Sequence, residues 1–516
     1  MHDCDVLIAG AGPTGLVLAL WLARLGVRVR IVDKVAEPGT TSRAIGVQAR
    51  TLEFYDQIGL ADEIIERGLK FSAANLWVKG RQVARIRFGD MGIGMSPYPY
   101  MLMFPQDEHE RVLIARLRDA GVGVERPVEL VRFDERGDRV IAELKHADGR
   151  TETCSTAYLA GCDGARSVVR EVLKTGFPGG TYAHIFYVAD IVGSGPVMNH
   201  ELHVALDDAA FLGVFPMKGE GRGRLIGTVK DTAVSAERPL EWSDIGSSVL
   251  ERLGIRVEHV NWFSTYHVHH RVAANFRVGR AFLLGDAAHI HSPVGGQGMN
   301  TGLGDAVNLA WKLAAVLQNR GSPRLLDTYE PERIAFAKRL VATTDRVFQL
   351  ATSDGARARF MRTHIVPYVM PMVFSFAAMQ RFMFRTISQT AIEYRRSALS
   401  IGGTGRIRGG DRLPWIEQAT GNSPGSDNFR SLRALDWQVH VYGSASPSVA
   451  ALCKTNHIDL HAFPWRDPMG GVGLVKDAAY LLRPDAYIGC MDATPAGREI
   501  ATYLETWGVH PLAVNA

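Results

Sequence analysis

The stretch CDVLIAGAGPTGLVLALWLARLGVRVRIVD, residues 4–33, decides the fold class of the chain. A short apolar run (4–9) is followed by the glycine-rich GAGPTG (10–15). The helical periodicity of LVLALWLARLG (16–26) comes next, and a second apolar run (27–33) ends the stretch. A strand, a tight turn, a helix and a second strand in this order predict a βαβ unit. We therefore expect an α/β fold that begins with a Rossmann-like unit.

The glycine turn has the composition of a dinucleotide-binding loop. Gly10 permits a sharp turn, Gly12 lets a pyrophosphate approach the backbone, and Gly15 lets the helix pack closely on the strand. Asp33 closes the second strand, where its carboxylate can accept hydrogen bonds from ribose hydroxyls. The residues predicted to bind the cofactor here are Gly10, Gly12, Pro13, Gly15, Asp33 and Lys34. A purely structural glycine turn is the alternative, and the turn alone does not decide between FAD and NAD.

Length and composition indicate a soluble globular protein of two or three domains. The chain has 516 residues, of which 46% are hydrophobic and 22% charged. The formal net charge of +4 is too small to indicate binding to nucleic acid or to an anionic membrane. The five cysteines lack CxxC spacing, and the N-terminus lacks a signal-peptide pattern. We therefore expect a reducing, cytoplasmic location.

A second glycine-rich stretch, LLGDAAHIHSPVGGQGMNTGLGDAVNLAWKL (283–313), also joins an apolar strand to a helix. Asp286 ends the strand, where its carboxylate can reach a polyol hydroxyl. GGQGMN (295–300) then opens a helix whose N–H groups and dipole would stabilise a reduced flavin. The stretch therefore favours a permanently held, extended cofactor such as FAD. A glycine-rich helix entry with a capping aspartate is the alternative.

A third motif, LAGCDGARSVVR (159–170), places Asp163 and Gly164 after another apolar strand. Alone, this pattern is also typical of an ordinary strand–turn–helix connection. With the three motifs in this order, however, the chain resembles the flavin-dependent aromatic hydroxylases. These are the single-component FAD monooxygenases typified by para-hydroxybenzoate and phenol hydroxylases. The resemblance covers about residues 1–400 and includes LLDTYEPERIAFAKRLV (325–341).

The resemblance implies roles for individual residues. It assigns Asp33 to the adenosine ribose and Arg43 to the FAD pyrophosphate. It assigns Gln106 and Asp286 to the ribityl chain, and Asp163 to a contact with both FAD and NAD(P)H. The residues that would line the flavin ring are Pro293, Gly298, Met299 and Asn300. The cofactors implied are FAD and, as electron donor, NADH or NADPH.

The resemblance also divides the chain into domains. We expect a Rossmann-like FAD-binding domain made of residues 1–175 and 270–400, interleaved with a β-rich substrate-binding domain at 176–269. Residues 405–516 resemble the thioredoxin-like C-terminal domain of the phenol hydroxylase subgroup. This domain lacks a CxxC pair, which argues against dithiol chemistry and favours a structural or contact role.

The function implied is that of an NAD(P)H-using monooxygenase, which hydroxylates a phenolic or related aromatic ring through a flavin C4a-hydroperoxide. Its partners would be a small aromatic substrate and O2, and the family often forms dimers. Epoxidation, or oxygenation of a non-aromatic or polyketide ring, would use the same motifs. A flavoprotein reductase without oxygen insertion would favour a second nucleotide fingerprint, which the sequence lacks. A non-enzymatic FAD-holding scaffold is the last alternative.

The strand-rich region supplies candidates for contacts with the substrate, although an apolar strand face is more often core. These candidates are Tyr187, Phe211, Phe215 and Met217. The catalytic candidates are His267 and His269, which alternate on one strand, and Pro293 beside the flavin. No acidic partner accompanies the histidines, so we expect no metal. No cluster of arginines is evident for a substrate carboxylate, which favours a neutral phenol, hydroxypyridine or polyketide ring over a benzoate.

One apolar segment raises the question of membrane contact. HIVPYVMPMVFSFAAMQRFMF (364–384) has no acidic or basic residue from Ile365 to Gln380. It is short for a membrane span and carries Pro367 and Pro371. We expect a buried or domain-covering helix here, with binding at a membrane interface as the alternative.

Overall fold

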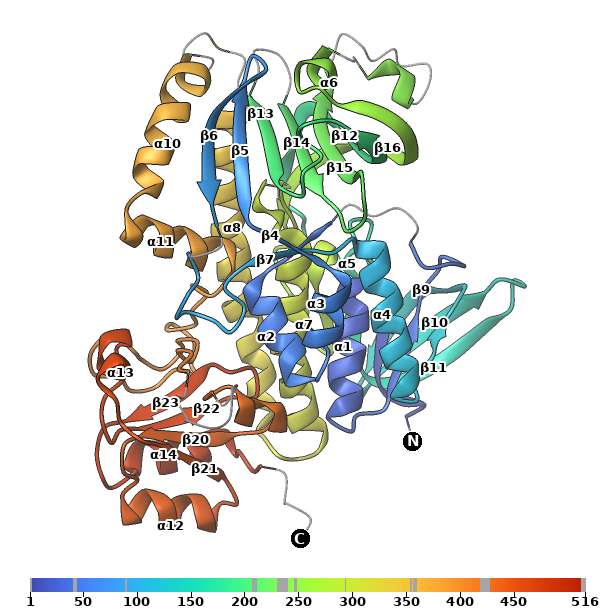
Figure 1. The fold of residues 1–516 in the computed structure, drawn as a ribbon. Coiled ribbons are helices and arrows are strands. Elements are labelled where there is room, and N and C mark those ends of the chain that lie inside the picture. Colours follow the sequence, from blue (N-terminus) through green and yellow to red (C-terminus); the bar gives the residue numbers. More distant parts are fainter. Residues whose placement is uncertain are drawn as a thin grey trace.

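The computed structural model describes residues 2–39, 44–88, 91–206, 211–229, 240–245, 248–292, 294–352, 355, 360–417 and 427–511. Its strands form two eight-stranded sheets, a four-stranded sheet and a small three-stranded sheet. One large sheet lies in the lower right of the molecule, the other at the top, and the four-stranded sheet at the lower left (Figure 1). The α/β fold class expected from the sequence is confirmed.

The first large sheet is built around the predicted βαβ unit. β1 (Cys4–Ala9) is almost entirely buried and pairs in parallel with both β2 (Val29–Val32) and β11 (Thr151–Gly161). The strand order is β17-β18-β11-β1-β2-β8, and β10 and β9 extend it from β11. α1 (Pro13–Arg24) packs against α4 and α7. The other elements here are β8 (Val124–Glu125), β9 (Val128–Arg136), β10 (Arg139–His146), β17 (Arg277–Val278), β18 (Ala281–Leu283), α4 (Gln106–Asp119), α5 (Val168–Val172) and α7 (Gly298–Leu317).

The second large sheet has the order β19-β16-β12-β15-β14-β13-β5-β6. Its strands are β12 (Gly179–Ser194), β13 (Leu202–Leu206), β14 (Phe211–Pro216), β15 (Arg222–Val229), β16 (Arg256–Val272), β19 (His289–Ile290), β5 (Ala73–Val78) and β6 (Arg81–Arg87). The last two come from the part of the chain that the sequence assigns to the first domain. The small sheet joins β3 (Gly46–Val47), β7 (Met101–Met103) and β4 (Leu69–Phe71), and the nearby helices are α2 (Ala49–Gln57) and α3 (Ala61–Arg67). α6 (Ser248–Arg252) lies at the top of the molecule beside the second large sheet (Figure 1).

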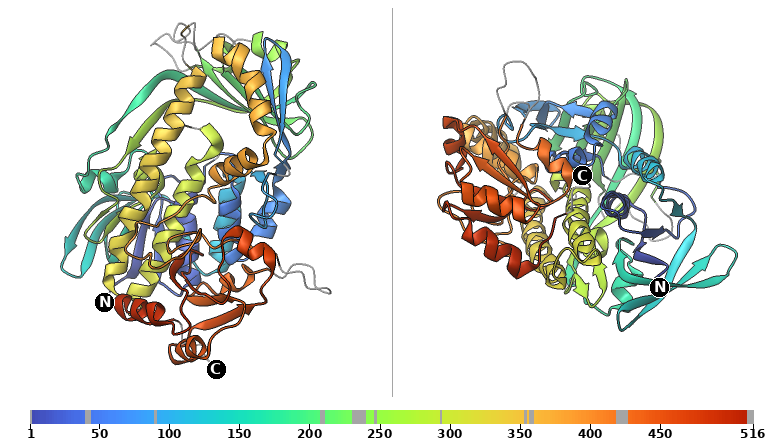
Figure 2. Two further views of the ribbon diagram at one scale, coloured as in Figure 1. Left: turned by 90° about the vertical axis from the view of Figure 1, so that its left-hand side faces the viewer. Right: turned by 90° about the horizontal axis from the view of Figure 1, so that it is seen from below.

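Three helices connect these parts. α8 (Tyr329–Thr352) runs from the C-terminal unit up to β16 of the second sheet (Figure 2). α10 (Val366–Phe374) packs on β6, and α11 (Ala377–Ile387) follows it. The segment 364–384 thus covers the edge of the second large sheet, as expected for the domain-covering helix that the sequence predicts. Within the described ranges, no helix has the length and apolar character needed to cross a bilayer.

The C-terminal unit is built on a four-stranded sheet in the order β21-β20-β22-β23. β20 and β21 are parallel, whereas β22 is antiparallel to β20 and to β23. Its elements are β20 (Gln438–Tyr442), β21 (Asp459–Phe463), β22 (Ala479–Leu482), β23 (Ile488–Asp492), α12 (Pro447–Thr455), α13 (Asp467–Val472) and α14 (Arg498–Trp507).

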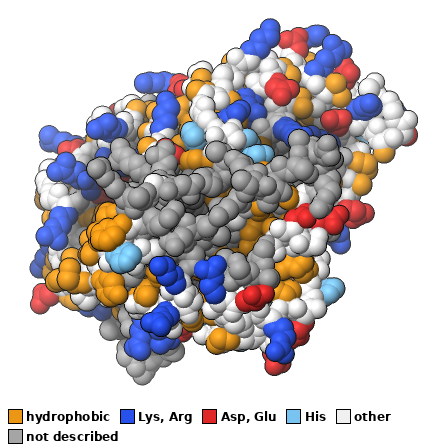
Figure 3. Space-filling view, turned by 90° about the horizontal axis from the view of Figure 1, so that it is seen from above, with side chains coloured by type: hydrophobic (Ala, Val, Ile, Leu, Met, Phe, Trp, Pro, Cys, Tyr) orange, Lys and Arg blue, Asp and Glu red, His pale blue; other side chains and the backbone are white. Residues whose placement is uncertain are grey.

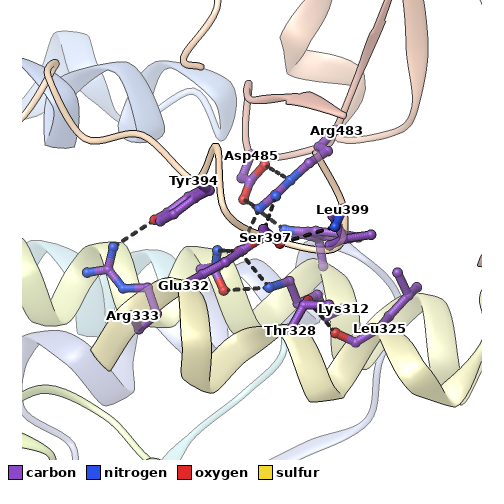
Figure 4. Close-up of polar contacts among 12 residues, drawn as sticks. Lys312, Leu325, Thr328, Glu332, Arg333, Tyr394, Ser397, Leu399, Arg483 and Asp485 are labelled. Carbon is purple, nitrogen blue, oxygen red and sulfur yellow. Dashed lines mark hydrogen bonds and ion pairs between the residues drawn. The ribbon is translucent and has the colours of Figure 1, made fainter. Parts of the chain in front are cut away.

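A buried charge network joins the C-terminal unit to helices α7 and α8 (Figure 4). Glu332 of α8 accepts hydrogen bonds from Lys312 of α7 (2.8 Å) and from both terminal nitrogens of Arg483 (2.8 and 3.0 Å). Arg483 also pairs with Asp485 at 2.6 Å. These side chains are at most 1% exposed. Burial lowers the pKa of Lys312 to about 8, although Glu332 opposes this effect.

Replacing Glu332 with glutamine should destabilise the protein strongly, because two buried cations then lose their shared carboxylate. We expect the free energy of unfolding to fall by about 3 kcal/mol, measured by urea denaturation. The control is Asp459→Asn, which neutralises an exposed carboxylate of the C-terminal unit and should change little. Equal stability of the two variants would contradict a network that holds the units together.

A buried histidine makes the first domain sensitive to acid. His109 of α4 is fully buried, and its Nε2 lies 2.6 Å from the hydroxyl of Tyr55. Burial lowers the pKa of His109 from 6.5 to about 3. The unfolded chain therefore binds a proton between these two values that the folded chain does not bind.

Stability should accordingly fall as pH drops from 6.5 toward 3, because protonation in this window favours the unfolded chain. A His109→Gln variant should lose less free energy of unfolding over the same window than the wild type. Substitution of the exposed His259 by Gln serves as the control for replacing a histidine with glutamine. A slope that is identical in the His109→Gln variant and the wild type would show that His109 is not responsible.

Candidate cofactor and substrate site

The first glycine turn joins β1 to α1, which begins at Pro13. Gly10 has a φ of +102°, and a Cβ there would lie 2.3 Å from the carbonyl oxygen of Cys162. A Cβ on Gly15 would lie 2.0 Å from the carbonyl oxygen of Gly10, so neither position has room for a side chain. A Cβ on Gly12 would meet nothing within 4 Å. Two glycines thus allow close packing, while Gly12 faces open space at a helix start that no side chain caps.

Asp33 holds this turn from the end of β2. It accepts hydrogen bonds from the N–H groups of Ala11 (2.7 Å) and Val35 (2.8 Å). Arg126 lies 3.4 Å from the same carboxylate and donates to the carbonyl oxygen of Ala11. Lys34 is exposed beside it. Arg126, which no sequence motif indicates, therefore places a cation next to the turn predicted to bind phosphates.

Gln106 is the first residue of α4 and anchors a neighbouring segment. Its Oε1 accepts a hydrogen bond from the N–H of Ala44 (3.4 Å), and its Nε2 donates to Glu110 (2.9 Å). Ala44 follows directly after Arg43, which lies outside the described residues, as does Pro293. The roles of Arg43 and Pro293 therefore stay predictions.

The third motif lies against the first turn, because the residue before Asp163 limits the space at Gly10. Asp163 Oδ2 accepts a hydrogen bond from the N–H of Val169 at 3.1 Å. Its Oδ1 is buried without a hydrogen-bond partner among the described residues, and burial raises the pKa of this carboxyl. Arg170, the residue after Val169, donates to the carbonyl oxygen of Ala287 in the second glycine-rich stretch.

The second stretch packs on α1 around Thr14. A Cβ on Gly285 would lie 2.7 Å from Thr14 Oγ1, and a Cβ on Gly302 would lie 2.4 Å from it. Asp286, next to Gly285, is exposed. Three motifs that are more than a hundred residues apart in the sequence therefore meet at the start of one helix.

A buried aspartate of α7 fixes the loop after β18. Asp305 Oδ2 accepts hydrogen bonds from the N–H of Gly285 (3.0 Å) and from His289 Nε2 (2.7 Å). Its Oδ1 accepts one from Arg333 of α8 at 2.6 Å. Burial alone would raise the pKa of Asp305, but the charges of Arg333 and His289 hold it below its usual range. The loop thus has an ionised, fully bonded anchor.

The double-glycine turn of this stretch is held from α2. Gln48 Nε2 donates to the carbonyl oxygen of Gly295 at 3.1 Å. Asn300 Oδ1 accepts the N–H of Gln48 (2.9 Å), and Asn300 Nδ2 donates to the carbonyl oxygen of Gly296 (2.9 Å). The Asn300 side chain therefore supports the turn from inside the protein.

Buried polar atoms without partners lie around these motifs. They are Asp163 Oδ1, His291 Nε2 and Ser292 Oγ among the described residues. Burial lowers the pKa of His291 to about 4, so its ring is neutral near neutral pH. No side chain caps α7, which starts at Gly298 and Met299. Together with the open space at the first glycine turn, these groups fit a ligand with phosphates, hydroxyls and a heteroaromatic ring, as FAD has.

One face of the second sheet is rich in aromatic side chains, and we call it the aromatic face. Its members are Phe186, Val188, Ile226 and Val268, with the partly buried Tyr182, Phe211, Phe215, Trp262 and Tyr266. Phe215 also packs with Ile45, Phe71 and Met103, which belong to the small sheet and its neighbours. This face is therefore turned toward the part of the molecule that carries the cofactor motifs.

The alternation of side chains decides which predicted substrate residues reach this face. Phe211 and Phe215 do. Tyr187 belongs to the cluster on the opposite face, and its ring lies 6.2 Å from that of Phe263. Met217 is buried with Ile45 at the border between the second sheet and the small sheet. The structure thus brings together two of the four residues on the aromatic face itself.

The two candidate histidines lie on the other side of β16. His267 and His269 flank Val268, whose side chain belongs to the aromatic face, so alternation directs both histidines away from it. His267 is exposed. His269 Nδ1 lies 2.7 Å from the hydroxyl of Thr181, and burial lowers its pKa.

The aromatic face carries an ion pair that the sequence does not reveal. Arg224 is fully buried, and its Nε and Nη2 donate to the two carboxylate oxygens of Asp190 at 2.6 and 2.7 Å. Its Nη1 donates to the carbonyl oxygen of Ala44 at 2.9 Å. The guanidinium is therefore engaged through all three nitrogens and links the sheet to the segment after Arg43.

A second polar group lies at the end of this face nearest to β19. Tyr182 of β12 donates to Asp345 of α8 at 2.5 Å, and both burial and this carboxylate raise the pKa of Tyr182. The ring of His270 lies 4.8 Å from that of Tyr182. His270 Nδ1 is buried without a hydrogen-bond partner in the part of the chain that the structure describes.

Comparisons with known proteins agree with this geometry. A family model described as "FAD binding domain" matches residues 3–344. The chain is 37% identical to a 6-methylpretetramide 4-monooxygenase of Streptomyces rimosus, over 83% of this chain and 77% of that protein.

Solved structures match over the whole length. An anhydrotetracycline hydroxylase from Streptomyces rimosus matches with a TM-score of 0.78 and 29% identity, over 98% of this chain and 99% of that one. An aklavinone-11 hydroxylase, solved with FAD and aklavinone, matches with a TM-score of 0.80 and 25% identity, over 98% of this chain and 99% of that one.

Replacing Gly12 with valine should separate folding from cofactor binding. A Cβ at Gly12 meets no protein atom within 4 Å, so the thermal stability of the FAD-free protein should stay close to that of the wild type. It would fill the space expected for the pyrophosphate, so we expect FAD affinity to fall at least about a hundredfold, measured by flavin fluorescence titration. Gly123→Val is the control, because a Cβ at that site also meets nothing within 4 Å. Undiminished FAD affinity in the Gly12 variant would place the pyrophosphate elsewhere.

Proposed function

The chain belongs to the FAD-binding-domain family of flavin-dependent monooxygenases, and on this premise we propose that it hydroxylates a phenolic ring of a polycyclic aromatic compound. NADH or NADPH would be the electron donor, and O2 the oxygen source. The aromatic face carries this proposal, because it presents a broad set of rings toward the cofactor motifs. Its arginine is already paired with Asp190, which supports a neutral substrate over a carboxylate.

The cofactor would be held by the motifs that meet at α1. Bound FAD supplies the electron and oxygen transfer that no side chain can perform. The N–H groups at the start of α1 would bind the pyrophosphate, with Asp33 at the ribose and Arg126 as a nearby cation. Asp163 and Asp286 would accept hydrogen bonds from hydroxyl groups, and the N–H groups at the start of α7 would contact the flavin ring.

The aromatic face would form the wall against which the substrate lies. Phe186, Phe211 and Phe215 present apolar rings that pack against a flat polycyclic molecule and exclude water. Arg224 would act as a positioning residue, because its bond to Ala44 couples this wall to the segment expected to meet the pyrophosphate.

The polar end of the aromatic face would receive the substrate hydroxyl. We assign the proton-accepting role to His270 Nδ1, because an imidazole is a better acceptor for a phenol proton than a carboxylate is. Tyr182, fixed by Asp345, would orient the His270 ring through their aromatic contact. The geometry favours this assignment over His267 and His269, which lie on the opposite face of β16.

We also propose that residues from 405 onward form a thioredoxin-like domain, supported by the strand order β21-β20-β22-β23 with α14 after the last strand. Its role would be structural, because Cys453 and Cys490 are both buried and each is a free thiol. We further infer a cytoplasmic enzyme, where NAD(P)H is supplied, and a homodimer as its oligomeric state.

The proposed activity is tested with the FAD-loaded enzyme, NADPH or NADH, and isotopically labelled O2. We expect a polycyclic phenol to stimulate NAD(P)H oxidation and to gain a labelled hydroxyl on an aromatic carbon, identified by mass spectrometry and NMR. A panel of substituted benzoates is the comparison and should be turned over poorly. NAD(P)H oxidation that yields only hydrogen peroxide with polycyclic phenols, polycyclic non-aromatic rings and benzoates alike would contradict the monooxygenase assignment.

The proton-accepting role of His270 predicts a loss of turnover when its ring is replaced. His270→Asn should lower kcat about a hundredfold, while FAD binding is retained. His267→Asn and His269→Asn are matched controls on the same strand and should keep kcat close to that of the wild type. If His267→Asn or His269→Asn, rather than His270→Asn, lowers kcat in this way, the assignment is wrong.

A further inference from the structure

The outer side of α10 and α11 exposes a row of large apolar side chains, which we call the α10–α11 face. Its members are Tyr368, Val369, Met372, Phe376 and Phe382, with exposed fractions of 70%, 42%, 60%, 61% and 63%. Phe360 and Met361 continue the row before α10. A folded chain rarely leaves so many large apolar groups together in water, so this face indicates a contact with something else.

The fold already uses the inner side of these helices. Phe374 is buried and its ring lies 6.4 Å from that of Phe88. Phe384 is buried as well, and a Cβ on Gly92 would lie 2.4 Å from its ring. Packing against the enzyme therefore explains one side of the helices and leaves the outer side without a partner among the described residues.

The stretch of chain that forms the α10–α11 face carries basic side chains and no acidic ones. No aspartate or glutamate occurs between Phe360 and Ile392, whereas Arg381 and Arg385 are exposed on α11. The neighbouring strand β6 adds the exposed Arg81 and Arg87. Viewed from above, hydrophobic side chains gather on the left of the molecule with Lys and Arg side chains beside them (Figure 3). The partner should therefore combine an apolar layer with negative charge.

We propose that the α10–α11 face docks this protein on an anionic lipid surface, with α10 lying in the plane of the membrane interface. Aromatic and apolar groups next to arginines are the composition of helices that lie in such an interface. The short, proline-containing α10 suits a helix that lies on a bilayer.

The position of this face in the molecule would matter for the substrate. α10 packs on β6, the edge strand of the sheet that carries the aromatic face. Docking would thus bring that sheet next to the lipid, from which a polycyclic aromatic compound can partition. The docking itself does not depend on the reaction, and its test needs no turnover.

The proposal is tested by co-sedimentation of the full-length, FAD-loaded protein with lipid vesicles. Vesicles with about one third phosphatidylglycerol should bind it, and pure phosphatidylcholine should bind it at least about tenfold more weakly. The double variant Met372→Ser/Phe376→Ser should lose about tenfold or more in affinity for the anionic vesicles. Arg381→Gln/Arg385→Gln should weaken binding to anionic vesicles and reduce its dependence on salt.

Val131→Ser/Val278→Ser is the matched control, since both valines are 40% exposed elsewhere on the surface. It should bind vesicles like the wild type. Retained FAD and an unchanged melting temperature would show that each variant is folded. Failure of the wild type to bind anionic vesicles, or unchanged binding by the Met372/Phe376 variant, would overturn the proposal. If light scattering instead shows a dimer that this variant dissociates, without vesicle binding, the face contacts a second copy and the lipid assignment is wrong.

Discussion

The carboxylate of Asp305 is the constraint on which the cofactor side of the molecule depends. It binds the N–H of Gly285, the ring of His289 and the guanidinium of Arg333, so one group fixes the loop after β18 to α7 and α8. A buried carboxylate is costly unless its oxygens are bonded, and here two cationic or polar side chains and a backbone donor bond it. These bonds within the protein hold the loop in place, so binding a ligand would require little reorganisation of the loop.

The same chain of contacts leads to the C-terminal unit. Arg333 donates to the hydroxyl of Tyr394, and the guanidinium of Arg483 lies 5.4 Å from the Tyr394 ring. Arg483 in turn binds Glu332, the residue next to Arg333 on α8. Consecutive residues of one helix thus hold the cofactor loop and the C-terminal unit. The unit therefore contributes to the rigidity of the site although it supplies no residue to the cofactor motifs.

Local patterns in the sequence predicted the strand, turn and helix around the glycine motifs, but not which distant side chains meet in the second sheet. Strand, glycine turn and acidic residue lie close together in the chain, so the turn at Gly10 could be predicted without the fold. The bonded pairs Asp190–Arg224 and Tyr182–Asp345 are 34 and 163 residues apart, and only the fold brings them together. The sequence also did not predict which face of the sheet each strand residue points toward. Phe186 and Tyr187 are equally aromatic neighbours, yet only Phe186 belongs to the aromatic face.

The β5–β6 hairpin has a consequence for how such enzymes can be recombined. The second sheet takes these two strands from residues 73–87 and five strands from residues 179–272. The chain then passes through β17 and β18 of the first sheet before β19 (His289–Ile290) returns to the second. In a chimera that exchanges only the segment from β12 to β16, the foreign β13 would have to pair with the β5 of the recipient enzyme. Transplanting the substrate wall between relatives therefore requires both segments to move together, and natural variation at the β13–β5 seam should be coupled across it.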